Sequence, residues 1–317
     1  MSSVDVTMPP GSRGARLRRS CLAVPGSSEK MLAKATTLPA DMVFIDLEDA
    51  VAPLEKTDET RAKVVRALRE RDWVAPTRVV RVNGVATRWC FRDIVYVVEQ
   101  AGDLVDCVML PKVESAAHVH FADHLLSQLE ADLALDRRIG LELQIESPRG
   151  LTAIEEITAA SDRTETIIFG PGDFAAALGA PQLSVGAVDP VYPGDQWHYV
   201  LMRIVTTARA HGLQAIDGPF AAIRDLDGLR EVARRSHALG FDGKWAVHPD
   251  QLAICNEVYA PSVEQFERAE RILAAYAAAT AGERRGAVLF EGEMIDEASR
   301  KLAEQTAARG RAAGLGA

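Results

Sequence analysis

Short apolar runs bounded by turn residues recur along the chain, and segments with a helical spacing of apolar positions separate them. The apolar runs are Cys21–Val24, Met42–Leu47, Arg78–Val82, Cys107–Leu110, Ile139–Ile145, Thr166–Phe169, Leu213–Ile216 and Gly240–Val247. The helical segments include Thr57–Glu70, Arg92–Ala101, Ala116–Leu133, Leu151–Ala160, Tyr199–His211 and Leu226–Leu239. This alternation is typical of βα units around a parallel sheet. Eight repeats predict an α/β protein of the (β/α)₈ TIM-barrel class.

Two features favour a closed barrel over an open, doubly wound sheet. The second, fifth and sixth runs are apolar along most of their length, as strands buried on both faces are. No GxGxxG sequence opens a helix after the first strand, so the dinucleotide-binding fingerprint of many open sheets is missing.

The chain divides into three predicted parts. Residues 1–15 are rich in Ser, Gly and Pro, which indicates a disordered lead-in. Residues 16–260 hold the eight βα units and form the expected catalytic barrel domain. Residues 261–317 are predicted to form helices over Ser262–Thr280 and Ala298–Ala308, with a short apolar run between them. Because this last part is too small to fold alone, we expect a helical lid or an oligomerisation segment.

Charge and composition exclude several classes of protein. The 317 residues carry a formal net charge of −9, which leaves no broad basic face for nucleic acid. No apolar run approaches the length of a membrane span, and we expect a cytoplasmic protein without a membrane partner. The four cysteines lie far apart without CxxC spacing, so they indicate neither a zinc site nor a disulfide framework.

Acidic residues follow two of the predicted strands. Glu146 ends the fifth apolar run, and Asp173 follows the sixth across a Gly-Pro-Gly turn. The carboxyl ends of neighbouring parallel strands meet at one rim of a barrel, where active sites lie. Carboxylate oxygens are hard ligands that suit Mg²⁺, with Mn²⁺ as an alternative. The pair therefore predicts a divalent-metal enzyme.

The second and third strands bring more charge to the same rim. Asp46, Glu48 and Asp49 end the second strand and repel one another unless a cation compensates, or else cap the next helix. Arg81 closes the third strand, where it can clamp an anionic ligand or pair with these acids.

The later strands end in groups with several interpretations. Lys112 and Glu114 follow the fourth strand, either as part of the site or as a stabilising rim pair. Lys244 in the eighth strand could form a Schiff base, although the acid cluster favours metal-based catalysis. Basic residues around the first strand could bind phosphates or form a solvated surface; they are Arg18, Arg19, Lys30 and Lys34. The histidines on the predicted helix Ala116–Leu133, namely His118, His120 and His124, lack an HExxH pattern and indicate a solvated helical face rather than a metal cluster.

Taken together, these segments resemble the CitE-like, HpcH/HpaI-type acyl-CoA lyases, relatives of the citrate lyase β subunit. The matching stretches are RRSCLAVPGSSEKMLAKA (18–35), FIDLEDAVAP (44–53), RVVRVNG (78–84), VMLPKVES (108–115), QIESPRGL (144–151), IIFGPGDFAAALG (167–179), LQAIDGPF (213–220), GFDGKWAVHPDQ (240–251) and EMIDEASRK (293–301). The resemblance covers residues 18–310. Within the family, the stretches around Trp73 and Trp89 are most similar to L-malyl-CoA/β-methylmalyl-CoA lyases.

The resemblance implies a role for individual residues. Glu146 and Asp173 correspond to Mg²⁺ ligands, Arg81 to a catalytic, substrate-binding cation, and Asp296 to the catalytic carboxylate. The implied contacts to the acyl-CoA or substrate are Lys30, Lys34, Arg81, Ile216 and Asp217. The implied groups behind the metal are Asp46, Glu48, Asp49, Lys112 and Glu114. Ala23 departs from relatives that carry an aromatic residue beside the CoA. An N-cap role for Asp296 is the alternative, because Asp commonly precedes a helix.

The implied reaction is the reversible cleavage of malyl-CoA or β-methylmalyl-CoA into glyoxylate and acetyl-CoA or propionyl-CoA. A malyl-CoA thioesterase, a citramalyl-CoA or citryl-CoA lyase, and a non-catalytic CoA-binding subunit are the alternatives. The expected partners are an acyl-CoA and glyoxylate or a small 2-oxo acid. The resemblance further implies a homo-oligomer, a trimer or hexamer, whose subunits share active sites.

Overall fold

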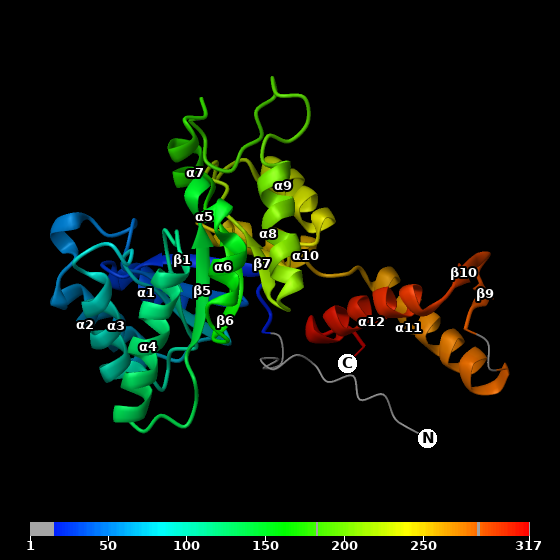
Figure 1. Cartoon of the computed structure of the whole chain (residues 1–317), viewed down its shortest axis with the longest axis horizontal. Coiled ribbons are helices and arrows are strands. Elements are labelled where there is room, and N and C mark those ends of the chain that lie inside the picture. Colours follow the sequence, from blue (N-terminus) through cyan, green and yellow to red (C-terminus); the bar gives the residue numbers. More distant parts are fainter. Residues whose placement is uncertain (1–15, 182, 284–285, 317) are drawn as a thin grey trace. The chain divides into compact units, whose positions relative to one another are not determined.

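The computed structural model describes residues 16–181, 183–283 and 286–316, so the predicted lead-in over 1–15 lies outside the described residues. The chain divides into two compact units, residues 1–256 and 257–317. The first unit contains eight parallel strands (Figure 1). Their bounds are β1 Ser20–Pro25, β2 Met42–Asp46, β3 Thr77–Arg81, β4 Cys107–Leu110, β5 Gly140–Ile145, β6 Thr164–Phe169, β7 Gln214–Asp217 and β8 Gly243–Ala246.

The eight strands form a closed barrel in chain order, which confirms the predicted (β/α)₈ fold and excludes the open sheet. The barrel closes where β1 pairs in parallel with β8, with Ser20 opposite Lys244 and Leu22 opposite Ala246. A register shift between Leu141 and Glu142 interrupts the pairing of β5 with β6. Because all strands run in parallel, their carboxyl ends form one rim, and the connections to the helices leave from that rim.

Helices follow the strands as the apolar spacing predicts. The helices of this unit are α1 Glu29–Ala35, α2 Asp58–Glu70, α3 Cys90–Ala101, α4 Ala116–Asp132, α5 Pro148–Thr152, α6 Ile154–Ala159, α7 Pro171–Leu178, α8 His198–Ala210, α9 Leu226–Leu239 and α10 Leu252–Val258, with short turns η1 Pro53–Glu55 and η2 Pro249–Gln251. The segment predicted as one helix over Leu151–Ala160 is two, because the backbone leaves the helical conformation at Ala153. Within the described residues, no helix is long and apolar enough to span a bilayer.

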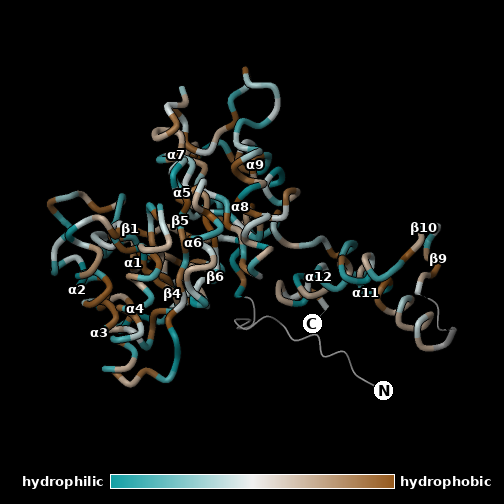
Figure 2. The backbone as a smooth tube through the Cα atoms, viewed as in Figure 1, coloured by the Kyte–Doolittle hydropathy of each residue, from teal (hydrophilic) through white to brown (hydrophobic). Residues whose placement is uncertain are grey.

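Large apolar side chains fill the barrel interior, and Figure 2 shows the hydrophobic stretches around β4 and β5. A buried cluster joins residues from seven of the strands, namely Cys21, Met42, Phe44, Val79, Cys107, Met109, Ile168, Ile216 and Trp245. Inward-facing side chains from all sides of a barrel pack into layers, so this cluster is a packed core and not a pore.

A buried arginine lies near the amino ends of the strands, opposite the expected active-site rim. Arg18 is 2% exposed. Its guanidinium donates to Glu142 at 2.9 Å, to Glu165 at 2.6 Å and to the amide oxygen of Gln214 at 2.6 Å. Arg18 thereby links the start of the chain to β5, β6 and β7.

The second unit is a pair of helices with a small hairpin. Its elements are α11 Val263–Ala278, a π-helical turn η3 Ala279–Glu283, β9 Val288–Phe290, β10 Glu293–Ile295 and α12 Glu297–Ala312. Phe266 and Ala269 of α11 pack against Ala303 and Ala307 of α12. The helices predicted for this part are present; β10, which pairs antiparallel with β9, was not predicted. The role of this unit as a lid or oligomerisation segment stays a prediction.

Candidate active site

A cavity of about 330 Å³ lies at the carboxyl ends of the strands. Its walls come from the ends of several strands and from the turn before α7. The lining residues are Ala23, Asp46, Asp49, Ala50, Arg81, Gln144, Glu146, Gly170, Pro171, Gly172, Asp173, Val185, Pro219, Trp245 and Val247. The volume suits a small ligand or the reactive end of a larger one. Both predicted metal ligands and the predicted catalytic arginine therefore line one cavity.

Arg81 closes β3 and is held rigidly by Asp46. The guanidinium Nε donates to Oδ1 of Asp46 at 2.8 Å, and one terminal nitrogen donates to Oδ2 at 2.6 Å. The other terminal nitrogen lies 3.5 Å from a carboxylate oxygen of Glu48. The guanidinium also lies over the ring of Trp245, 5.1 Å from its centroid. This fork-to-fork pairing is the structural alternative raised for Arg81, and it fixes a cation in the cavity wall.

Glu146 follows β5 and is 3% exposed. One of its oxygens accepts a hydrogen bond from the backbone N–H of Lys112 at 2.5 Å, and the other from the side-chain amide of Gln144 at 2.9 Å. Burial raises the pKa of Glu146 well above its usual range, and the neighbouring charge of Asp173 adds to this effect although Arg81 opposes it. A buried carboxylate in this state is stabilised by a nearby cation.

Asp173 lies in the first turn of α7, where helical amides favour a negative charge. Its side chain is 46% exposed and lies 3.8 Å from the ammonium of Lys112. Asp173 is thus the more accessible of the two predicted ligands, while Glu146 is fixed by the protein.

Glu48, Asp49 and Lys112 form a compact ionic group at the rim. The Lys112 ammonium lies 2.6 Å from Glu48 and 3.2 Å from Asp49. Burial and a hydrogen bond with Asp49 raise the pKa of Glu48 to about 7. Burial opposes ionisation of Asp49 too, but the hydrogen bond with Glu48 and the charges of Arg81 and Lys112 lower its pKa. Lys112 has a φ of 54°, a left-handed conformation that is uncommon for a residue other than glycine, and its N–H donates to Glu146.

The donor set fits a hard divalent cation. Glu146 and Asp173 supply two carboxylates to one cavity, and the charge of Asp173 raises the pKa of the buried Glu146 further. Among the described residues, no group of three or more His, Cys, Asp or Glu side chains is arranged to hold a metal. Mg²⁺ binds commonly through one or two carboxylates and completes its shell with water or substrate oxygens, so two ligands suffice.

Other predicted substrate contacts lie around the barrel mouth or below it. Lys30 and Lys34 are exposed on α1, one helical turn apart. Ile216 is fully buried in the barrel core, so its side chain does not line the cavity. Asp217 is buried and pairs with Lys244 at 2.6 Å, which leaves no free amine at that position.

Glu114 and Asp296 both accept hydrogen bonds at the start of a helix. Glu114 accepts a hydrogen bond from the hydroxyl of Ser147, the N-cap of α5, at 2.8 Å. Asp296 is the N-cap of α12 and accepts a hydrogen bond from the backbone N–H of Ser299 at 3.1 Å. That hydrogen bond lowers the pKa of Asp296, so its carboxylate is ionised near neutral pH. The structural role proposed as the alternative for Asp296 is therefore present, and it does not exclude a catalytic one.

Several site features were not predicted from the sequence. Gln144 positions Glu146 and Trp245 covers Arg81, but neither residue carries a charge pattern that would single it out. The phosphate-binding interpretation of Arg18 and Arg19 is wrong. Arg18 is buried with Glu142, and Arg19 forms a two-pronged pair with Asp41 at 2.7 and 2.8 Å.

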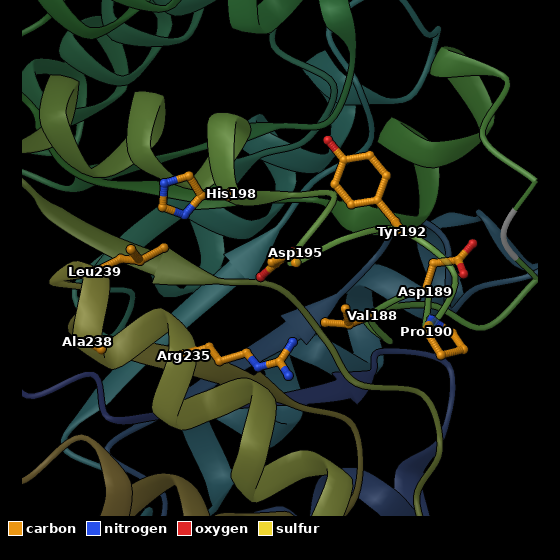
Figure 3. A pocket seen from close by; sticks show the side chains of 10 residues that line it. Val188, Asp189, Pro190, Tyr192, Asp195, His198, Arg235, Ala238 and Leu239 are labelled. Carbon is orange, nitrogen blue, oxygen red and sulfur yellow. The ribbon is translucent and has the colours of Figure 1, made fainter.

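A second cavity, of about 620 Å³, lies between the loop that precedes α8 and the end of α9 (Figure 3). Its acids accept hydrogen bonds from nearby backbone amides, Asp189 from Val191 and Asp195 from Trp197. Arg235, whose side chain extends into this cavity in Figure 3, pairs with Glu231 one turn earlier on α9. These groups are used in local turns and pairs, so the first cavity is the better candidate for chemistry.

Comparison with known proteins agrees with the geometry of the first cavity. The chain is 40% identical over 300 residues to an L-malyl-CoA/β-methylmalyl-CoA lyase of Cereibacter sphaeroides, covering 92% of this chain and 93% of that protein. It is 36% identical to a (3S)-malyl-CoA thioesterase of the same species, covering 93% and 95%. A crystal structure of the Mycobacterium tuberculosis CitE protein with magnesium, acetoacetate and coenzyme A is 32% identical, with a TM-score of 0.72 and coverage of 93% and 97%.

A family model covers most of the barrel. The model that describes the HpcH/HpaI aldolase/citrate lyase family matches residues 19–249, which run from the start of β1 to beyond β8. The match includes both predicted metal ligands and Arg81. The chain therefore belongs to the HpcH/HpaI aldolase/citrate lyase family.

Proposed function

We propose that this protein is a Mg²⁺-dependent acyl-CoA lyase. It reversibly cleaves L-malyl-CoA and β-methylmalyl-CoA to glyoxylate and acetyl-CoA or propionyl-CoA. The observation that carries the proposal is the convergence of Glu146, Asp173 and a rigid Arg81 on one cavity at the barrel rim. The 40% identity to a relative with this activity supports the choice of substrates.

The residues divide the chemistry between them. When bound by Glu146 and Asp173, Mg²⁺ supplies Lewis-acid polarisation of the substrate oxygens. Arg81 stabilises the negative charge that develops on the thioester oxygen as the carbon–carbon bond breaks, because its guanidinium is already oriented by Asp46. Lys112 balances the acids around it, so that Glu48 and Asp49 do not repel an anionic substrate.

Asp296 is the group we assign to proton transfer. In the condensing direction its carboxylate removes a proton from the acyl-CoA carbon, and in cleavage its acid form returns that proton. The lowered pKa of Asp296 supplies the basic form near neutral pH. We place Asp296 in the active site of a neighbouring subunit within a homo-oligomer, because it lies in the second compact unit and not at the end of a barrel strand.

The reaction is tested directly on the purified protein. Incubation with Mg²⁺, glyoxylate and either acetyl-CoA or propionyl-CoA is expected to give malyl-CoA or β-methylmalyl-CoA by mass. Asp173→Asn should abolish this activity with the fold intact, because an amide does not supply the charge that a hard cation requires. A chelator should act in the same way. Full activity in metal-free buffer would contradict the metal assignment.

A thioesterase is the second candidate, favoured by the 36% identity to a (3S)-malyl-CoA thioesterase. The two activities differ in their products. Hydrolysis releases free CoA thiol and malate, whereas cleavage releases glyoxylate and leaves the thioester intact. Thiol release without glyoxylate from malyl-CoA would assign the thioesterase activity instead.

The shared site is tested by mixing two inactive proteins. Asp296→Asn retains an N-cap for α12 but lacks a basic oxygen, and Asp173→Asn lacks a metal ligand. Co-refolding is expected to restore part of the activity, because some interfaces then pair an intact barrel with an intact Asp296. A mixed oligomer that stays inactive, or a fully active monomeric wild type, would rule out the shared site.

A further inference from the structure

A cavity of about 500 Å³ lies between the connections that follow β2 and β3, and it shares no lining residue with the candidate active site. Its lining residues are Lys56, Thr57, Asp58, Arg61, Arg88, Trp89 and Arg92. Four of the seven are cationic and one is acidic. The cavity lining therefore has a positive net charge, whereas the chain as a whole has a net charge of −9.

Three of the four cations have no carboxylate partner. Arg61 is neutralised by Asp93 at 2.7 Å and by Asp58 at 2.8 Å. The other three cations are Lys56, Arg88 and Arg92. In the part of the chain that the structure describes, no carboxylate lies within ion-pair distance of them. Clustered cations without counter-charges repel one another, and an anionic ligand relieves that repulsion.

Two of these three cations are positioned by neighbouring side chains and not merely solvated. The Lys56 ammonium donates to the side-chain oxygen of Asn83 at 2.6 Å and lies 5.2 Å from the ring centroid of Trp89. The Arg88 guanidinium lies 5.0 Å from the same centroid. Asn83 is itself buried and held by Asp93 at 2.6 Å, so this side of the cavity is anchored to the end of β3.

The backbone of the cavity wall also favours an anionic ligand. The helices α2, of 13 residues, and α3, of 12 residues, both begin here, and their N-cap residues are Thr57 and Trp89. Neither helix has a side-chain cap on its first turn. Uncapped first-turn amides and the positive end of a helix dipole favour an anion.

We propose that this cavity is a binding site for a phosphate-bearing ligand. Arginine and lysine side chains from two adjacent loops and from the first turns of the helices that follow them match phosphate oxygens. The volume exceeds that of a single phosphate, so a diphosphate or nucleotide fits. The same chemistry has two sources: the phosphates of the acyl-CoA itself, or a free phosphorylated metabolite that binds beside the active site. The proposal is independent of the lyase assignment.

Calorimetric titration of the full-length protein with inorganic pyrophosphate, at constant ionic strength, tests the site. The double variant Arg88→Gln/Arg92→Gln should weaken binding by at least about 10-fold, because each removes a charge-assisted contact. The matched control, Arg66→Gln/Arg69→Gln, removes the same charge from arginines that are paired with Glu29 and Asp103. Its affinity should stay within about 2-fold of the wild type.

Kinetics on the same proteins distinguish the two sources. If the site holds the substrate's phosphates, the Arg88→Gln/Arg92→Gln variant raises KM for the acyl-CoA by about 10-fold without lowering kcat, and pyrophosphate competes with the acyl-CoA. If it holds a free metabolite, KM is unchanged and pyrophosphate binds together with CoA. Equal pyrophosphate affinity in wild type, variant and control would overturn the proposal, whether or not the protein is a lyase.

Discussion

Replacing Gly170 by Ala is a sharp test of how precisely Glu146 must be placed. Gly170 precedes α7 with φ −105° and ψ 84°, a conformation that alanine also adopts, so the substitution changes only the occupied space. A Cβ at this position would lie 2.5 Å from the Cβ of Glu146, 2.7 Å from its Oε2 and 2.9 Å from the amide nitrogen of Gln144. Real Cβ atoms essentially never approach other atoms closer than 3.0 Å, and ordinary contact begins at 3.4 Å, so Glu146 and its backbone must shift by roughly 0.5–1 Å.

That shift has two measurable consequences. Glu146 is held by hydrogen bonds of 2.5 and 2.9 Å, which a displacement of this size breaks, and overpacking of this kind costs about 1–3 kcal/mol of stability. Misplacing a catalytic group by about 1 Å lowers the rate by roughly 10²-fold. We expect Gly170→Ala to lose kcat by about that factor and to require more Mg²⁺ for half-maximal activity.

The matched control lies two residues later. A Cβ at Gly172 would meet only the side chain of Val185, at 3.4 and 3.6 Å, so Gly172→Ala should retain stability and kcat. Thermal unfolding and a coupled assay for glyoxylate formation across a Mg²⁺ titration measure both variants. A Gly170→Ala enzyme with the wild-type rate and Mg²⁺ dependence would refute the reasoning that Glu146 is a positioned ligand.

Three further predictions concern the charged groups around the cavity. Arg81→Lys keeps a charge but loses the two-pronged donor, so kcat should fall by about 10²-fold. The control Arg163→Lys, at a buried arginine outside the cavity, should lower only the melting temperature, and normal turnover by Arg81→Lys would show that Arg81 has a structural role. With a chelator present, the raised pKa of Glu48 stabilises the folded protein by up to about 3 kcal/mol; this contribution is complete below pH 4.5 and is lost as the pH rises through about 7. Denaturant titrations at pH 5 and 8 should show that Glu48→Gln lacks this pH dependence, and identical pH dependence in both proteins would contradict the prediction. Lys244→Met should destabilise the barrel by about 3–5 kcal/mol, because it leaves the charge of Asp217 buried without a cationic partner. Borohydride with glyoxylate should not inactivate the wild type, and covalent trapping on Lys244 would show instead that Lys244 forms a Schiff base.

The barrel could be predicted from the sequence because its strands are short apolar runs that are buried on both faces. Turn residues mark both ends of each run, and eight regular repeats leave few alternative folds. The hairpin strand β10 could not be predicted, since it is three residues long and begins with the charged, exposed Glu293. The break between α5 and α6 at Ala153 could not be predicted either, because the helical spacing of apolar residues continues across it.

The positions of the rim acids could also be predicted, but the choice between their alternative partners could not. Strand ends converge in any parallel barrel, so the sequence indicates that Asp46 and Arg81 lie close together. Whether a cation meets a carboxylate, a ligand or water depends on side-chain geometry within an ångström, and Arg81 meets Asp46 through both of its oxygens. The cationic cavity around Trp89 is the extreme case, because its members are spread over two loops and the helices that follow them, with no regular spacing.

The buried Arg18 near the amino ends of the strands bears on the order in which the barrel can form. Three of its partners, Glu142, Glu165 and Gln214, lie 124, 147 and 196 residues later in the chain. Until those partners have been synthesised, a chain that has folded its first strands holds a cation that can be buried only at high cost. The first half-barrel is therefore not a stable stopping point during synthesis, and closure is a late step that joins both halves at once.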